Sequence, residues 1–183
     1  MIINKDGTIQ GKLEETVCFD DVLLKPRYSN IKSRSEVDIG NDLGDQHYYL
    51  PIISSPMDTV TEEEMCLAMA GRGGLGVIHR YNSIDAQQKT IENLYNKISN
   101  VAVAIGVSDD FELRARACVA SGASTLCIDV AHGHHVLVEN AIKTLKDRYG
   151  ESVHVMAGNV ATLEAFNDLS DWGADSIRVG VGG

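Results

Sequence analysis

The chain has 183 residues, a length that suits one domain with a sizeable hydrophobic core. Its formal net charge of −10 argues against non-specific nucleic-acid binding, which requires a basic surface. The sequence shows no signal peptide and no apolar run of membrane-spanning length, and its four cysteines form no CxxC pair. We therefore expect a cytoplasmic protein with reduced thiols and with neither a membrane nor a nucleic acid as partner.

Residues 1–50 combine a short amphipathic run with turns and charges, as in FDDVLLKPRYSNIKSRSEVDIG. This pattern leaves no room for a second folded domain. We expect an amino-terminal extension that packs on the main domain, with Val22, Leu23 and Leu24 held on a hydrophobic surface of that domain.

Short apolar runs recur about every 25 residues from residue 51 onward. They are PIISS (51–55), LGVIH (75–79), VAVAIG (101–106), STLCIDV (124–130), VHVMAG (153–158) and SIRVGVG (176–182). The segments between them show helical periodicity and helix start or stop signals, and residues 81–100 suit one helix with its connections. Apolar strands that alternate with helices indicate parallel β/α units.

Two α/β folds fit this alternation, the (β/α)₈ TIM barrel and the open doubly wound sheet. Polar and glycine residues follow every predicted strand rather than one or two of them, which favours the barrel. We therefore predict that residues 51–183 form about the first six β/α units of a TIM barrel. A barrel without two strands has open edges, so the sequence looks truncated and should fold poorly alone.

Several residues at the predicted strand ends suit ligand binding. Ser55 and Met57 offer a hydroxyl and a polarizable face for a planar base, although Ser-Pro is also a common turn and methionine a common core residue. Asp129 ends a strongly apolar strand, where a carboxylate requires a partner such as ribose hydroxyls or the amides of its own loop.

The last two predicted strands end on further candidates. Asn159 can orient a carboxamide or a nucleophile, because its side chain both donates and accepts hydrogen bonds. Arg178 could reach the top of the barrel or pair with an acidic neighbour. The glycines of VGVGG (179–183) uncover carbonyls and amides that can hold a monovalent cation or a phosphate, or form a plain turn.

His132, His134 and His135 raise the alternative of a metal-dependent hydrolase. Three histidines within four residues do not easily face one ion, and no second cluster of ligands completes a metal shell. None of the cysteines lies at a strand end beside a base, so the sequence contains no obvious nucleophile.

A series of motifs resembles the family of inosine monophosphate (IMP) dehydrogenases and guanosine monophosphate (GMP) reductases. They are FDDVLLKP, SRSEVD, ISSPMDTVTE, GGLGVIHR, DVAHGH, MAGNVAT and GAD-x-IRVGVGG, and they occur in the order and at the spacing of that family. The resemblance covers nearly the whole chain and itself implies a TIM barrel that binds a purine nucleotide and NAD.

The resemblance also implies roles for single residues. Ser55 and Met57 match positions that contact the purine nucleotide, and Asp129 matches the aspartate that holds the cofactor's ribose. Asn159 matches an asparagine beside the nicotinamide and the catalytic cysteine.

In that family a loop after the sixth strand carries the catalytic cysteine, which here would follow Gly183. Arg178 matches a basic residue beneath this loop. Gly180, Val181 and Gly182 match the stretch that contacts the cofactor, and Gly182 matches the first carbonyl of a potassium site. The chain alone should therefore be inactive.

The implied reaction is the NAD-dependent oxidation of IMP to XMP in guanine nucleotide synthesis. A cysteine thiolate adds to C2 of the purine, hydride leaves to NAD, and water hydrolyses the thioimidate. The motifs SSPMDTVTE, GGLGVIH and DVAHGH favour the dehydrogenase over the NADPH-dependent GMP reductase. Residues 81–100 leave no space for the CBS modules of most dehydrogenases, but the reductase and some dehydrogenases also lack these modules. The family usually forms homotetramers, and a truncated protein that only binds a nucleotide is a further alternative.

Overall fold

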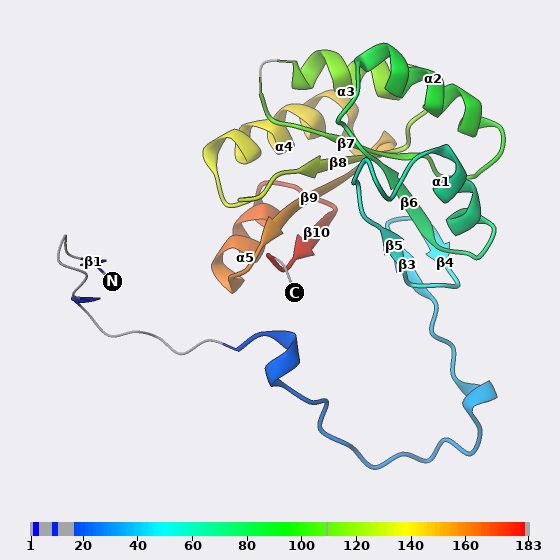
Figure 1. The fold of residues 1–183 in the computed structure, drawn as a ribbon, viewed down its shortest axis with the longest axis vertical. Helices are drawn as coiled ribbons and strands as arrows, with labels where there is room; N and C mark the ends of the chain where they lie inside the picture. Colours follow the sequence, from blue (N-terminus) through cyan, green and yellow to red (C-terminus); the bar gives the residue numbers. More distant parts are fainter. Residues whose placement is uncertain (1, 4–8, 11–16, 109, 182–183) are drawn as a thin grey trace.

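The computed structural model describes residues 2–3, 9–10, 17–108 and 110–181. Its body is a curled parallel sheet of six strands that follow one another in chain order (Figure 1). The strands are β5 (Ile53–Ser54), β6 (Leu75–Ile78), β7 (Ala102–Ile105), β8 (Thr125–Asp129), β9 (His154–Val160) and β10 (Ser176–Val179). Each of the six predicted apolar runs coincides with one of these strands, although β9 continues two residues beyond its run.

Five α-helices link successive strands and lie on the outer face of the sheet (Figure 1). They are α1 (Glu63–Ala70), α2 (Ile84–Tyr95), α3 (Phe111–Ala120), α4 (Val136–Tyr149) and α5 (Leu163–Asp171). Side chains cap three of them: Ser83 accepts a hydrogen bond from the Ala86 amide, His135 accepts one from the Leu137 amide, and Thr162 accepts one from the Ala165 amide. None of the helices in the described residues is both long and apolar enough to cross a membrane.

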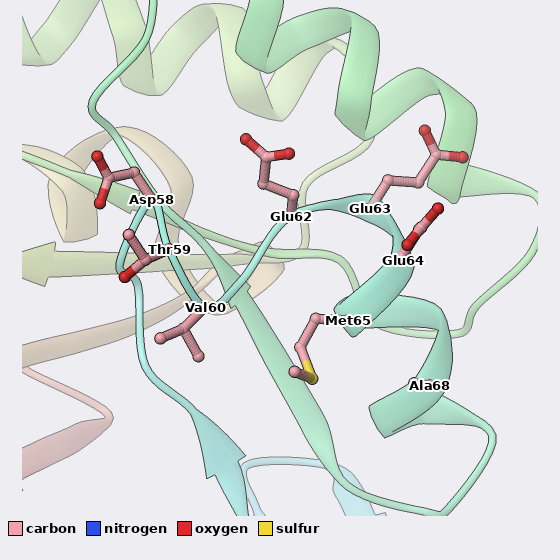
Figure 2. A pocket seen from close by; sticks show the side chains of 8 residues that line it. All are labelled: Asp58, Thr59, Val60, Glu62, Glu63, Glu64, Met65 and Ala68. Atoms are coloured by element: carbon pink, nitrogen blue, oxygen red, sulfur yellow. The ribbon is translucent and has the colours of Figure 1, made fainter.

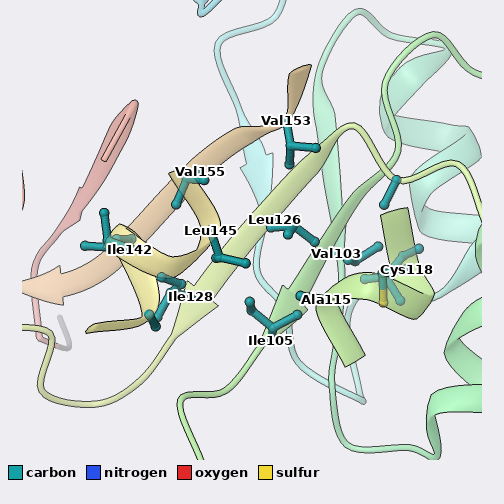
Figure 3. Close-up of a cluster of buried hydrophobic side chains, with 14 of the residues drawn as sticks. Val103, Ile105, Ala115, Cys118, Leu126, Ile128, Ile142, Leu145, Val153 and Val155 are labelled. Atoms are coloured by element: carbon teal, nitrogen blue, oxygen red, sulfur yellow. The ribbon is translucent and has the colours of Figure 1, made fainter. Parts of the chain in front are cut away.

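The main hydrophobic core lies between the sheet and these helices (Figure 3). Strand residues such as Val103, Ile105, Leu126 and Ile128 are completely buried there. Each such side chain contributes about 1.5–3 kcal/mol when it leaves water. Gly76 permits the close approach of α1 to β6, because a Cβ at this position would lie 2.8 Å from Cys66 Cα.

The inner face of the sheet carries a smaller core and no helix of the described residues. Its members are Leu75, Val77, Ala102, Ala104, Cys127 and Met156. The antiparallel hairpin of β3 (Asn41–Leu43) and β4 (Gln46–Tyr48) packs Leu43 and Tyr48 against this cluster. Because a doubly wound sheet has helices on both faces, this arrangement instead agrees with part of a TIM barrel.

The amino-terminal segment is separate from this body (Figure 1). It contains the short antiparallel pair β1 (Ile2–Ile3) and β2 (Ile9–Gln10), and the 3₁₀ turns η1 (Phe19–Asp21) and η2 (Arg34–Glu36). A third such turn, η3 (Gly150–Ser152), follows α4. The hydrogen bonds of residues 17–39 join residues at most four apart, so within the described part of the chain none connects this segment to the sheet.

In this structure neither Leu23 nor Leu24 is held on the barrel, and the packing of the whole extension on it stays a prediction. Leu23 and Leu24 are 97% and 99% exposed. Val22 is 49% exposed, so the two leucines are the apolar side chains of this run that are almost completely exposed.

The two outermost strands differ from those between them. Residues of β6 and β7 are all buried, whereas Ile53 of β5 and Val179 of β10 are 44% and 62% exposed. Within the described residues, β5 and β10 each pair with one neighbour only. The expected open edges of the sheet are thus present.

Candidate functional site

Three neighbouring strands, β8, β9 and β10, end beside one hollow of about 410 Å³. Its lining consists of Arg80, Tyr81, Asp129, Val130, Ala131, Asn159 and Val181. The structure therefore brings together three of the predicted cofactor residues, Asp129, Asn159 and Val181. The carboxyl ends of parallel strands are where α/β proteins commonly build their sites.

Asp129 forms an ion pair with Arg178, whose Nη1 donates to the carboxylate Oδ1. Both residues lie level with Gly158 of the intervening strand β9. A Cβ at Gly158 would lie 2.8 Å from Arg178 Cβ, so the missing side chain leaves space for the arginine beside it. The ion pair offsets the cost of placing a carboxylate at the end of an apolar strand.

Asn159 connects the ends of all three strands. Its backbone amide donates to the Val130 carbonyl at 2.9 Å, and its side-chain Nδ2 donates to the Gly180 carbonyl at 2.7 Å. The Asn159 carbonyl accepts from the Gly133 amide at 2.7 Å. Within the described residues its side-chain oxygen has no hydrogen-bond partner, so it remains available to a ligand.

The chain turns at Gly180, where φ is +118°. Residues with a side chain rarely adopt this conformation, which explains the glycine. The turn brings Val181 to the hollow. Gly182, expected to contact the cofactor and to supply a potassium carbonyl, lies outside the described residues.

Ser55 and Met57 follow β5, at the other edge of the sheet order from Gly180. They do not line the 410 Å³ hollow. The Thr61 hydroxyl donates to the Ser55 carbonyl at 2.6 Å, and the Met57 amide donates to the same carbonyl at 2.8 Å. This turn leaves Met57 50% exposed, so its apolar face is accessible rather than part of the core.

A second hollow, of about 610 Å³, lies beside the start of α1 (Figure 2). Its charged lining residues are all acidic: Asp58, Glu62, Glu63 and Glu64. Glu62 is bonded to His79 at 3.2 Å and Glu63 to Lys97 at 3.0 Å. Because the lining holds carboxylates and no cation, this hollow does not suit an anionic nucleotide.

The three neighbouring histidines do not converge. His134 Nε2 lies 2.7 Å from Asp168 Oδ2, whereas His135 Nδ1 accepts a hydrogen bond from the Leu137 amide at the start of α4. The rings of His132 and His135 lie 6.4 Å apart. No group of three or more His, Cys, Asp or Glu side chains in the described residues could hold a metal ion, so the metal-hydrolase alternative finds no support in this part of the chain.

Burial also makes three cysteines unsuitable as nucleophiles. It raises the pKa of Cys127 to about 11, and the pKa values of Cys66 and Cys118 to about 12. At neutral pH these groups are thiols, although the nucleophilic form is the thiolate. Cys18 is exposed, but it lies in the segment that is separate from the sheet.

Four lining residues of the hollow were not predicted as site residues: Arg80, Tyr81, Val130 and Ala131. Arg80 and Tyr81 follow β6 after His79, and Arg80 Nε donates to the Asp129 carbonyl at 3.3 Å. Their position after a strand, with Arg80 as the last residue of the motif GGLGVIHR, is a signal that could have identified these two. Spacing alone could not, because 49 residues separate Arg80 from Asp129.

The sequence was compared with family models and curated proteins. The model of the IMP dehydrogenase / GMP reductase domain matches residues 16–183. A GMP reductase of Acidovorax sp. (strain JS42) is 36% identical over 167 residues, which cover 90% of this chain and 50% of that protein. A GMP reductase of Paracidovorax citrulli (strain AAC00-1) is 37% identical over 167 residues, with the same coverage.

A further relative is the inosine-5′-monophosphate dehydrogenase of Borreliella burgdorferi (strain ATCC 35210 / DSM 4680 / CIP 102532 / B31). It is 32% identical over 221 residues, which cover 92% of this chain and 54% of that protein. The chain thus spans about half the length of the curated relatives it matches. Because the family model matches most of the chain, this protein belongs to the IMP dehydrogenase / GMP reductase family of oxidoreductases.

Proposed function

We propose that this chain is the nucleotide-binding part of an enzyme that oxidises IMP to XMP with NAD. The observation that carries the proposal is the hollow where Asp129, Asn159 and Val181 meet at the ends of three strands. Its volume of about 410 Å³ lies in the range of small-molecule sites, roughly 300–1,000 Å³.

The residues of this hollow suit a nicotinamide dinucleotide. Asp129 presents a carboxylate to ribose hydroxyls, and its pairing through Oδ1 with Arg178 leaves Oδ2 without a hydrogen-bond partner among the described residues. The free side-chain oxygen of Asn159 can accept from the carboxamide of a nicotinamide. When bound, the cofactor supplies the hydride acceptor, while these side chains hold and orient it.

We place the purine nucleotide at the turn after β5, on Ser55 and Met57. The exposed thioether of Met57 offers a polarizable apolar face for a purine. In this proposal Arg178 positions Asp129, and a cysteine supplied after Gly183 forms the covalent bond to C2. Gly180, Val181 and Gly182 contact the cofactor, Gly182 offers a carbonyl to potassium, and the complete enzyme is a homotetramer with residues 51–183 as part of its barrel.

The reduction of GMP to IMP with NADPH is a second candidate. It is supported by the relatives that are themselves named GMP reductase. Both reactions exchange a hydride at C2 of a purine mononucleotide, so the hollow described above fits either of them.

An assay of the protein produced from its complete reading frame distinguishes the two reactions. We expect IMP with NAD to raise the absorbance at 340 nm and to yield XMP. Consumption of NADPH with GMP, accompanied by ammonium release and no reaction of IMP with NAD, would instead assign the reductase. If neither pair reacts and neither mononucleotide binds, the proposed function is wrong.

A further inference from the structure

Arg80 lines the hollow but does not take part in the Asp129–Arg178 ion pair. It is partly buried, and its Nε donates to the Asp129 carbonyl at 3.3 Å. Gly106 borders it without a side chain, since a Cβ there would lie 3.4 Å from Arg80 Nη1. The guanidinium therefore occupies a space that the neighbouring strand end leaves open.

Arg80 differs from the other partly buried arginines in its lack of an ion-pair partner among the described residues. Three arginines of the described chain are partly buried: Arg80, Arg114 and Arg178. Arg114 pairs with Asp110 at 3.3 Å and Arg178 pairs with Asp129, whereas no carboxylate of the described residues forms an ion pair with Arg80. Within the same residues the two Nη groups of Arg80 make no hydrogen bond.

A partly buried cation without an anionic partner is costly unless a ligand supplies the anion. The hollow and the residue beneath it hold two arginines, Arg80 and Arg178, against one aspartate, Asp129. This local positive balance occurs in a chain with a formal net charge of −10, and the excess of positive side chains here favours an anionic ligand.

Tyr81 supports the guanidinium from one side. The Arg80 Cζ lies 5.3 Å from the centre of the Tyr81 ring, a distance typical of a cation–π contact. The Tyr81 ring in turn stacks on His79, with ring centres 6.3 Å apart and an interplanar angle of 17°. This stack limits the positions of the arginine head and reduces the entropy lost when it binds a ligand.

From these observations we propose that Arg80 binds a phosphate group of the nicotinamide dinucleotide, with Tyr81 as its support. The inference rests on the proposed function and adds a cationic subsite to it. A planar guanidinium with free Nη groups can donate two hydrogen bonds to one phosphate. The phosphate is either the pyrophosphate that all such cofactors share or the 2′-phosphate of NADP.

The test is calorimetric titration of the protein produced from its complete reading frame with NAD, NADP, IMP and GMP. The variants are Arg80→Gln, Arg80→Lys and the control Arg116→Gln, which removes the same charge from an exposed position of α3. Because charge-assisted hydrogen bonds are lost, we expect Arg80→Gln to weaken dinucleotide binding roughly tenfold to a hundredfold. Mononucleotide affinity and the unfolding midpoint should remain close to those of the unchanged protein.

The pattern of losses identifies the phosphate. An equal loss for NAD and NADP indicates the pyrophosphate, and a loss confined to NADP indicates the 2′-phosphate. Arg80→Lys should restore part of the affinity, since an ammonium keeps the charge without the planar pair of donors. Arg116→Gln should change no affinity by more than about twofold, because exposed charges at a distance are screened by salt.

Other outcomes overturn the inference. Unchanged dinucleotide affinity in Arg80→Gln excludes Arg80 as a ligand, and an equal loss for mononucleotides and dinucleotides assigns it a structural role. If the unchanged protein binds a mononucleotide but no dinucleotide, the inference about Arg80 is wrong, whereas the proposed binding of the purine mononucleotide is retained. If it binds none of the four compounds, the proposed function fails together with the inference.

Discussion

At the amino ends of the strands, polar side chains form hydrogen bonds with one another. At the carboxyl ends, several donors and acceptors have no partner among the residues that the structure describes. The amino end contains a hollow of about 320 Å³ that includes Asn100, Ser124, Thr125, His154 and Asp175. Asn100 Nδ2 donates to the Tyr48 hydroxyl, and Asn100 Oδ1 accepts from Ser124 and Thr125.

The carboxyl end contains a hollow of similar size, but fewer of its polar side-chain groups have a hydrogen-bond partner. Within the described residues the side-chain oxygen of Asn159 and the Nη groups of Arg80 have no partner. The comparison teaches that the volume of a hollow does not identify a site. Polar groups that satisfy one another stabilise the fold, and groups held in place without a partner are able to bind a ligand.

The largest expected effect is a difference in labelling rate between the exposed Cys18 and the cysteines buried in the protein interior. Burial raises the pKa of Cys127 to about 11, so at pH 8 only about one such group in a thousand is a thiolate, in keeping with thiolate-controlled reactivity. In the native protein we expect iodoacetamide to label the exposed Cys18 at least a hundredfold faster than Cys66, Cys118 or Cys127, as measured by mass spectrometry of the peptides. Equal labelling of Cys18 and Cys127 would mean that the interior opens readily.

The second test concerns the bonded network at the amino end. Asn100→Ala removes the partner of the Tyr48, Ser124 and Thr125 hydroxyls, and we expect the free energy of unfolding to fall by roughly 2–3 kcal/mol. Urea denaturation measures this change, with the exposed Asn167→Ala of α5 as the control. Ligand affinities should be unaffected, and a loss of dinucleotide binding instead of stability would contradict the assignment of the two ends.

The third test concerns the ion pair beneath the carboxyl end. Arg178→Met leaves the partly buried Asp129 carboxylate without its cation, which should cost about 2 kcal/mol, below the 3–5 kcal/mol of a fully buried pair because both side chains are partly exposed. Adding Asp129→Asn should recover part of this loss, as a double-mutant cycle by urea denaturation measures. Purely additive losses would show that the pair does not couple the two strands.

The smallest effect is a dependence on pH at the amino end. Burial lowers the pKa of His154 from 6.5, although Asp175 opposes this shift. The unfolded chain therefore binds a proton more readily than the folded protein. The contribution of His154 to stability is fully present above pH 6.5, declines as the pH falls through that value, and becomes constant below the lowered pKa.

Urea denaturation at a series of pH values measures this contribution. His154→Gln should flatten the dependence below about pH 6.5, whereas His132→Gln, at an exposed position, should leave it unchanged. If both variants follow the unchanged protein, other groups are responsible for the dependence.

Much of the architecture could be predicted from the sequence, because its signals are local. A strand or a helix is encoded by the periodicity of a short window, and caps such as Ser83 and Thr162 lie within a few residues of the helices that they start. The motifs identified the family in the same way. Asp129, Asn159 and Val181 could be assigned to one place because parallel strands bring their carboxyl ends to the same edge.

Contacts between distant residues were decided by the tertiary structure alone. The sequence left open whether Asp129 bonds loop amides or a ligand and whether Arg178 has an acidic partner, and the register of β8, β9 and β10 pairs them level with Gly158. It also gave no basis for placing Arg80 beside Asp129, for the divergence of the histidines, or for the exposure of Leu23 and Leu24. The physical reason is that periodicity reports which face of an element is apolar, whereas strand register and the available partner surface determine which side chains meet.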